Sequence, residues 1–272
     1  GEKSNSRAFL DAKLSERSEL IMLCHRVIPI VLLDGYSVLK TIEFDIRRNL
    51  GNPITIAKIY NSRKVDELIL LDIDASKEKR SIDLHTVTEV AKECFMPLTV
   101  GGGIRDCNDI TAILEAGADK VSINSSFLEG LDFIKEAVNV FGSQCIVISL
   151  DIKKDQQNEF QIFSHVGIKH QISLCKALKR IEECKAGEIL LNNVDLDGKM
   201  TGYDLEIIKI VSLKINIPII AAGGASKPED FGRAVRAGAS ASSGSSIFHF
   251  TSFTPNDCKD AMAKAGIEVR KL

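Results

Sequence analysis

Residues 96–125, MPLTVGGGIRDCNDITAILEAGADKVSINS, have a close counterpart in residues 217–246, IPIIAAGGASKPEDFGRAVRAGASASSGSS. Each stretch begins with a short apolar run that ends in glycines. It continues through a segment of helical periodicity and finishes in a second short run followed by small polar residues. Glu67 and Glu188 precede the two stretches at the same distance, so the unit recurs at an offset of 121 residues. A constant offset across two strand-helix units predicts a fold of two similar halves.

The same alternation extends along the rest of the chain. Short apolar or β-branched runs predict eight strands, at 26–33, 67–74, 96–101, 120–124, 145–151, 188–193, 217–223 and 239–245. Segments with a period of three to four residues predict eight helices, at 53–63, 83–94, 107–117, 131–142, 172–184, 203–214, 227–238 and 255–266. Eight such pairs predict an α/β fold, the (β/α)8 TIM barrel. A doubly wound open sheet is the alternative, but its glycine-rich phosphate turn does not follow the first predicted strand.

Composition limits the class of protein. The chain has 272 residues, 44% of them hydrophobic, which is enough for one large core. A formal net charge of -2 favours neither nucleic acid nor an anionic membrane as a partner. The seven cysteines lack the close paired spacing of a zinc site, so we expect reduced cysteines, a cytoplasmic protein and no metal.

The N-terminus differs from the rest of the chain. Residues 1–21 are polar and lack the apolar core of a signal peptide. We expect them to form a disordered or non-native extension outside a barrel of residues 22–272. No apolar run approaches the roughly 18 residues of a transmembrane helix.

Glycines and small polar residues follow four of the predicted strands. Active sites of this fold lie at the C-terminal ends of the strands, where the repeat places Gly103 and Gly224. Glycine lets backbone N–H groups approach an anion closely. The residues that can complete each site are Asn124 and Ser125 in one half and Ser245 and Ser246 in the other. We predict two phosphate sites and a ligand with a phosphate at each end; the alternative is that the glycines turn the chain and the serines cap helices.

Carboxylates also lie at the ends of predicted strands. They are Asp72, Asp74, Asp151, Asp195 and Asp197. Asp151 closes the apolar run CIVISLD, where a carboxylate is costly unless it is hydrogen-bonded or takes part in chemistry, so it is the main acid/base candidate. A role as a loop cap, or an ion pair with Lys153 or Lys154, is the alternative.

The first predicted strand, RVIPIVLL, lacks such a carboxylate. Laying the fifth strand over it at a shift of 119 residues places Leu32 at the position of Asp151. Asp34 has the same strand parity as Leu32 and is the candidate to replace the missing acid, although it lies in the predicted turn.

Eight motifs together resemble the cyclase subunit family of imidazole glycerol phosphate synthase, from about residue 26 to residue 272. The motifs are RVIPI, DELILLDIDAS, PLTVGGGIR, AGADKVSINSS, FGSQCIVISLDIKK, GEILLNNVDLDGKMTGYDLE, IPIIAAGGAS and SSIFHF. The resemblance implies a partner glutaminase on the bottom face of the barrel, whose ammonia passes through the barrel core to the top; we expect no cofactor. It implies a charged ammonia gate at Arg26, Glu67, Lys120 and Glu188. An ordinary interior layer of ion pairs is the alternative.

On the top face the resemblance implies two catalytic aspartates, which map to Asp151 and to Leu32. Asn192 and Asn193 stand where the family usually has threonine and serine. The candidates for phosphate and substrate binding are Lys40, Asp72, Gly103, Asn124, Ser125, Asn193, Asp195, Asp197, Gly198, Gly224, Ser245 and Ser246. The acid/base pair is therefore broken unless Asp34 substitutes for Leu32.

This combination resembles a branch of the family encoded with surface-polysaccharide (lipopolysaccharide) genes. That branch implies that barrel and glutaminase supply ammonia to a separate sugar amidotransferase. The alternative is a genuine cyclase-lyase that forms imidazole glycerol phosphate and an aminoimidazole carboxamide ribotide in histidine biosynthesis. A phosphosugar isomerase on a similar barrel is a third candidate, against which Leu32 also counts. Because loss of one acid/base group costs on the order of 10² to 10⁴ in rate, we favour the ammonia-supplying branch.

Overall fold

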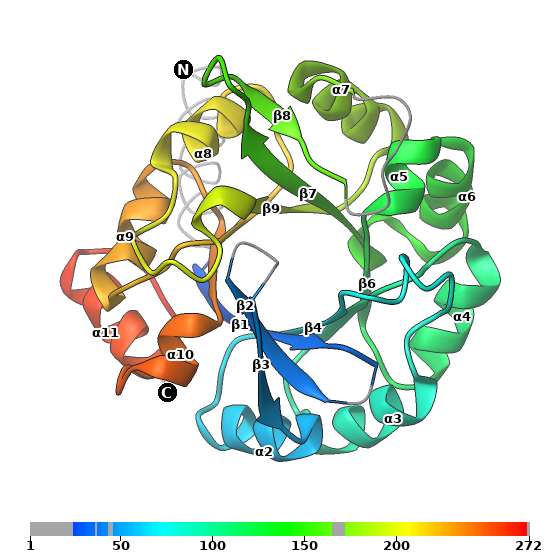
Figure 1. Cartoon of the computed structure of the whole chain (residues 1–272). Coiled ribbons are helices and arrows are strands. Elements are labelled where there is room, and N and C mark those ends of the chain that lie inside the picture. The colour runs from blue at the N-terminus through cyan, green and yellow to red at the C-terminus, as the bar shows by residue number, and fades with distance from the viewer. Residues whose placement is uncertain (1–23, 36, 43–45, 165–171, 271–272) are drawn as a thin grey trace, which may run out of the picture.

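The computed structural model describes residues 24–35, 37–42, 46–164 and 172–270, so the extension expected at 1–21 lies outside the described residues. Figure 1 shows a ring of strands surrounded by helices. The barrel strands are β1 (Arg26–Leu33), β4 (Leu68–Asp72), β5 (Leu98–Gly101), β6 (Lys120–Ile123), β7 (Ile146–Lys154), β9 (Glu188–Asn193), β10 (Ile219–Ala222) and β11 (Ala241–Gly244). All pair in parallel with their neighbours, and β11 pairs with β1 to close the sheet. The predicted TIM barrel is confirmed.

The eight predicted helices form the outer layer. They are α2 (Pro53–Ser62), α3 (Leu84–Glu93), α4 (Cys107–Glu115), α6 (Asp132–Phe141), α7 (Leu174–Cys184), α8 (Leu205–Ser212), α9 (Pro228–Arg236) and α11 (Pro255–Lys264). Several begin at a side-chain cap, such as Asp83 before α3 and Asp204 before α8, because the carboxylate accepts hydrogen bonds from the first turn. Their apolar faces pack on the strands and form the larger hydrophobic core. Within the described ranges, no helix is long and apolar enough to cross a membrane.

Short elements interrupt this pattern and were not predicted. They are the hairpin of β2 (Val38–Ile42) and β3 (Ile46–Gly51), the strand β8 (Phe160–Ile162), the helices α5 (Ser125–Glu129) and α10 (Ser246–Phe250), and the 3₁₀ turns η1 (Ser143–Cys145) and η2 (Val194–Leu196). Each has at most six residues, which is too short for a reliable hydrophobic period. All but η1 lie in segments that follow barrel strands, so they shape the mouth.

The hydrogen-bond register agrees with the overlay of the two halves. Leu32 of β1 pairs with Leu71 of β4, and Asp151 of β7 pairs with Asn192 of β9. Leu71 and Asn192 are 121 residues apart, which is the offset of the repeat. Leu32 and Asp151 therefore occupy equivalent positions on equivalent strands.

Side-chain alternation separates a second, inner core from the outer one. Ile28, Ile69, Val147, Leu190 and Ile220 form an apolar cluster inside the barrel, each at most 1% exposed. The inner cluster lies between a charged base and a polar mouth, so the barrel interior is closed by different chemistry at its two ends.

A buried ion pair ties α11 to the base of the barrel. Lys259 Nζ lies 2.6 Å from Asp66 Oδ1, and the two side chains are 4% and 5% exposed. The other oxygen of Asp66 accepts a hydrogen bond from Val27 N in β1. Asp66 thereby joins the C-terminal helix to the first barrel strand.

Substituting Lys259→Met should leave Asp66 buried without its cation and lower the free energy of unfolding by about 3–5 kcal/mol. Urea unfolding of both proteins measures the loss. Lys264→Met, an exposed lysine of the same helix, is the control and should change stability by less than about 0.5 kcal/mol. Equal stabilities for the two variants would contradict this role of the ion pair.

Candidate functional site

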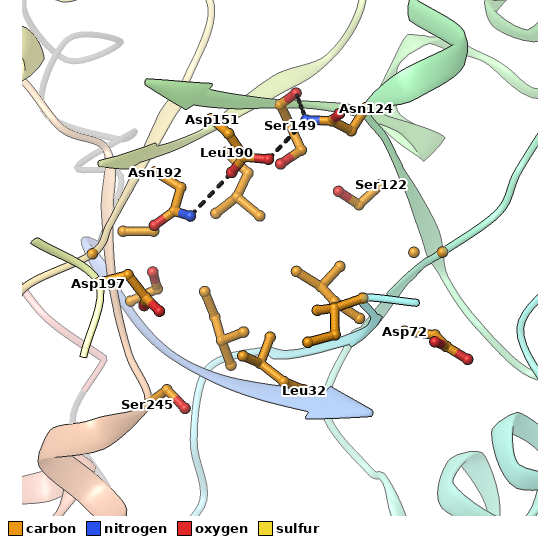
Figure 2. A pocket seen from close by; sticks show the side chains of 18 of the residues that line it. Leu32, Asp72, Ser122, Asn124, Ser149, Asp151, Leu190, Asn192, Asp197 and Ser245 are labelled. Carbon is orange, nitrogen blue, oxygen red and sulfur yellow. Dashed lines mark hydrogen bonds between the residues drawn. The ribbon is translucent and has the colours of Figure 1, made fainter. Parts of the chain in front are cut away.

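A cavity opens at the C-terminal ends of the barrel strands, where active sites of this fold lie. Its apolar floor includes Leu32, Leu71 and Leu190. Figure 2 shows Leu32 and Asp151 on opposite sides of the cavity. The predicted site residues that line it are Asp72, Gly103, Asn124, Ser125, Asp151, Asp197, Gly198, Gly224, Ser245 and Ser246.

Asp151 lies between two side-chain amides. Asn124 Nδ2 is 3.1 Å from Asp151 Oδ2, and Asn192 Nδ2 is 3.0 Å from Asp151 Oδ1. Asn124 Nδ2 also donates to Ser149 O at 3.0 Å. The hydrogen bonds account for a carboxylate at the end of an apolar strand and hold it in one orientation toward the cavity.

Asn192, rather than Asn193, reaches the cavity. Asn193 lies on the other face of β9, where its Nδ2 donates to Asp204 Oδ2 at 2.9 Å. The alternation of side chains along the strand predicts that Asn192 faces the barrel interior, because Leu190 and Asn192 share a face. The prediction of Asn193 as a substrate contact did not use that alternation.

The position equivalent to Asp151 is apolar in the first half. Leu32 packs with Ile30, Leu71 and Leu39. Leu39 comes from β2 and is the paired neighbour of Leu32 in the antiparallel ladder. The hairpin therefore brings a further apolar side chain to this side of the mouth.

Asp34 is not among the residues that line the cavity. It is exposed, and its Oδ1 accepts a hydrogen bond from Ser37 N at 3.2 Å. The carboxylate thus closes the turn between β1 and β2. Lys40 lies in β2, but its side chain is outside the described part of the structure.

The two glycine turns have matching geometry. Gly103 and Gly224 both have positive φ, of 67° and 99°. A β-carbon at Gly103 would lie 1.9 Å from Arg80 O, and one at Gly224 would lie 2.2 Å from Gly202 O. Close backbone approach therefore requires glycine at both positions, and both turns line the cavity.

The polar side chains beside the glycine turns differ between the halves. Ser245 Oγ and Ser246 Oγ are buried and have no hydrogen-bond partner among the described residues. Their counterparts are Asn124, which bonds Asp151, and Ser125, which lines the cavity. Buried hydroxyls without partners are unfavourable, so a bound ligand or water is needed to satisfy the second-half pair.

Asp72, at the edge of the cavity, supports a loop. Arg80 Nη1 lies 2.5 Å from Asp72 Oδ2, and Oδ1 accepts from Asp74 N and Ala75 N. The pKa of Arg80 is raised, mainly because its side chain is hydrogen-bonded to Asp72. Arg80 was missed because only the folded loop brings it to Asp72, and no sequence period marks that contact.

Of the predicted site residues after β9, one stabilises a neighbouring strand end and two line the cavity. Asp195 Oδ2 accepts a hydrogen bond from Lys154 N at 2.7 Å and so holds the end of β7. Asp197 and Gly198 line the cavity. Among the described residues, no three His, Cys, Asp or Glu side chains are grouped so that they could hold a metal ion.

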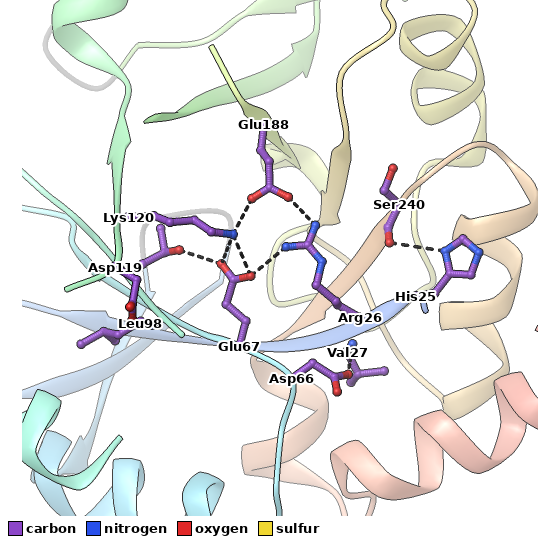
Figure 3. A network of polar contacts seen from close by, with 11 residues as sticks. His25, Arg26, Val27, Asp66, Glu67, Leu98, Asp119, Lys120, Glu188 and Ser240 are labelled. Atoms are coloured by element: carbon purple, nitrogen blue, oxygen red, sulfur yellow. Dashed lines mark hydrogen bonds and ion pairs between the residues drawn. The ribbon is translucent and has the colours of Figure 1, made fainter. Parts of the chain in front are cut away.

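At the opposite end of the barrel, four charged side chains form a closed ring (Figure 3). Arg26 forms ion pairs with Glu67, at 2.8 Å, and with Glu188. Lys120 Nζ lies 3.1 Å from Glu67 Oε2 and 2.8 Å from Glu188 Oε2. The structure thus brings together all four residues of the predicted gate, with charges that alternate in sign.

The ring favours the ionised form of its members. Burial alone would raise the pKa of Glu188, but hydrogen bonds and charges from Arg26 and Lys120 lower it below 4.5. Burial would likewise lower the pKa of Arg26, but Glu188 and Glu67 raise it. Thr99 Oγ1 donates to Glu67 Oε1 at 2.7 Å and was missed, although it faces inward from β5.

The fold and the two polar ends define a (β/α)8 barrel of two similar halves with a cavity at its mouth and a charged ring at its base. Residues 26–254 match the family described as Histidine biosynthesis protein, and the chain belongs to this family.

Three relatives show where the chain lies within the family. It is 49% identical over 251 residues to the "Putative imidazole glycerol phosphate synthase subunit hisF2" of Campylobacter jejuni subsp. jejuni serotype O:2, covering 92% of this chain and 100% of that protein. It is 42% identical over 253 residues to the imidazole glycerol phosphate synthase subunit HisF of Corynebacterium glutamicum strain R, covering 90% and 98%. The HisF of Endomicrobium trichonymphae is 42% identical over 252 residues, covering 92% and 97%. The resemblance to the cyclase subunit family is confirmed.

Substituting Glu188→Gln should destabilise the protein at pH 7 by about 2 kcal/mol, because Arg26 and Lys120 lose a partly buried anion. The lowered pKa means that the contribution of Glu188 is complete above pH 4.5 and disappears as the pH falls through its folded-state value. Urea unfolding at several pH values should therefore show a gap between wild type and variant that shrinks in acid.

Glu206→Gln is the control, since Glu206 is an exposed carboxylate 3.2 Å from Lys154 Nζ and should contribute at most about 1 kcal/mol. A pH-independent gap for Glu188→Gln would contradict this account of the ring.

Proposed function

We propose that this barrel receives ammonia from a partner glutaminase at its base and delivers it at the mouth to another substrate, without carrying out the cyclase reaction itself. The observation that carries the proposal is Leu32 at the position equivalent to Asp151, in a barrel that has a charged ring at its base and two glycine turns at its mouth.

The base supports the proposal. The four-residue ring closes the barrel with charges that must separate or shift before a molecule can pass. Arg26 and Lys120 keep 25% and 19% of their side chains exposed, so both are accessible from below. A docked glutaminase could therefore act on the ring directly, and we propose that Arg26, Glu67, Lys120 and Glu188 are the ammonia gate.

The barrel interior suits ammonia better than ammonium. The inner cluster above the ring is apolar and almost completely buried. An ion would lose its hydration there at a cost of several kcal/mol, whereas a small neutral molecule would not. Passage of neutral ammonia is thus the form of transport that these side chains favour.

The mouth supports binding more than acid/base chemistry. Asp151 is present, but leucine can neither accept nor donate a proton, and Asp34 is engaged in the turn outside the cavity. Loss of one of two acid/base groups costs on the order of 10² to 10⁴ in rate. The glycine turns and the hydroxyls of Ser245 and Ser246 fit a phosphorylated ligand.

The same proposal implies two cytoplasmic partner proteins. A glutaminase would form a heterodimer with the base, and a sugar amidotransferase of surface-polysaccharide synthesis would take ammonia at the mouth. The relative from Campylobacter jejuni has a hisF2 name, which fits a second, divergent copy of the subunit.

A genuine cyclase-lyase of histidine biosynthesis is the second candidate. The observation that favours it is the family match over most of the chain together with the retained Asp151, glycine turns and ring. It requires another group to take the role of the missing strand-1 acid.

Wild-type protein should show no enzyme-like turnover of the bis-phosphorylated ribotide intermediate of histidine biosynthesis with ammonium salt. Leu32→Asp should gain measurable turnover, because it places a second carboxylate across the cavity from Asp151. The assay is the formation of imidazole glycerol phosphate. Turnover by the wild-type protein would support the cyclase-lyase instead. Loss of that turnover in Asp34→Asn would support it further.

A further inference from the structure

Two asparagine side chains hold Asp151 at the mouth of the barrel. Asn124, Asp151 and Asn192 lie on three adjacent strands or strand ends, and we call them the Asp151 clamp. Both carboxylate oxygens accept an amide N–H, at 3.1 and 3.0 Å, from opposite sides (Figure 2). A planar carboxylate held at both oxygens cannot rotate without breaking one of these bonds.

Asn192 is itself fixed on its other side. Its backbone pairs with Asp151 in the parallel ladder between β7 and β9. Its Oδ1 lies against the second-half glycine turn, where a β-carbon at Gly223 would be 2.9 Å from it. The amide therefore lies between the carboxylate and the turn, and its Nδ2 donates to Asp151 Oδ1.

The positions related to the clamp by the internal repeat contain no such arrangement. Ser245 of the second half corresponds to Asn124, and Leu32 and Leu71 of the first half correspond to Asp151 and Asn192. Leu32 and Leu71 pack together with Leu39 in the inner apolar cluster. The position across the cavity that is equivalent to Asp151 is thus apolar.

We propose that Asn192 is a specificity-determining residue that holds Asp151 as a fixed hydrogen-bond acceptor and, together with Leu32, prevents it from acting as an acid/base group for ring closure. This inference rests on the proposed function. Each carboxylate oxygen has two lone pairs, so Oδ1 can still accept a hydrogen bond from a ligand, but the bond from Asn192 fixes the direction from which a reacting group can approach it. The ligand group opposite the clamp is then a donor, such as an amine, an amidine or a sugar hydroxyl. The opposite face of the ligand then contacts Leu32.

The test compares wild type, Leu32→Asp, and Leu32→Asp combined with Asn192→Thr. Threonine keeps a side chain suited to a strand but is too short to hold Asp151 Oδ1, so it should free that oxygen. With the bis-phosphorylated ribotide and ammonium salt, the double variant should exceed Leu32→Asp in kcat by at least about tenfold, a fraction of the 10² to 10⁴ that an acid/base group contributes. KM should stay within about twofold, because Asn192 does not form the phosphate sites.

Leu32→Asp combined with Asn108→Thr, an exposed asparagine of α4, is the matched control and should equal Leu32→Asp. Far-UV circular dichroism and urea unfolding establish that each variant is folded.

The outcomes separate this inference from the proposed function. Equal kcat for Leu32→Asp and the double variant would overturn the role of Asn192 and leave the proposed function intact. Folded variants that all lack turnover would also overturn it, because freeing Asp151 would then have no effect. Enzyme-like turnover by wild type would overturn the proposed function itself.

Discussion

Closure of the parallel sheet determines which side chains meet inside this barrel. Because β11 pairs with β1 and every strand alternates, a slip of one residue would move the whole inner set of a strand to its outer face. The closed register places Arg26 at the base and Leu32 at the mouth of β1, and Glu188 and Asn192 at the two ends of β9. The charged ring and the cavity are therefore built on the same strands, and neither can shift without the other.

Most of the fold could be predicted from the sequence because it depends on local periodicity and on one repeat offset. The eight barrel strands follow from short apolar runs, whereas the four ring residues were implied by the family resemblance. The hairpin of β2 and β3 has strands of five and six residues and leaves little periodic signal.

Side-chain contacts within the site were harder to predict. The Arg80–Asp72 pair depends on a loop conformation that no spacing reveals. Asn192 could have been distinguished from Asn193 by strand parity. Parity also explains the placement of Asp34, since the alternation it shares with Leu32 ends where β1 ends, at Leu33.

The two halves have the same backbone design but opposite chemistry at the mouth. The second half has a hydrogen-bonded carboxylate and two buried hydroxyls, whereas the first half has Leu32 and Leu71 at the equivalent floor positions. An acid/base pair needs carboxylates on both sides, and a binding site for a ligand with one polar and one apolar face does not. This difference is the physical basis for the proposal that the barrel delivers ammonia instead of closing a ring.

The most direct test follows nitrogen from glutamine. The purified complex of barrel and glutaminase is given amide-¹⁵N glutamine and the bis-phosphorylated ribotide, and ¹⁵N is located by NMR. The account predicts that glutamine is hydrolysed and that the label appears as free ammonium. Label in the ring of imidazole glycerol phosphate would contradict it.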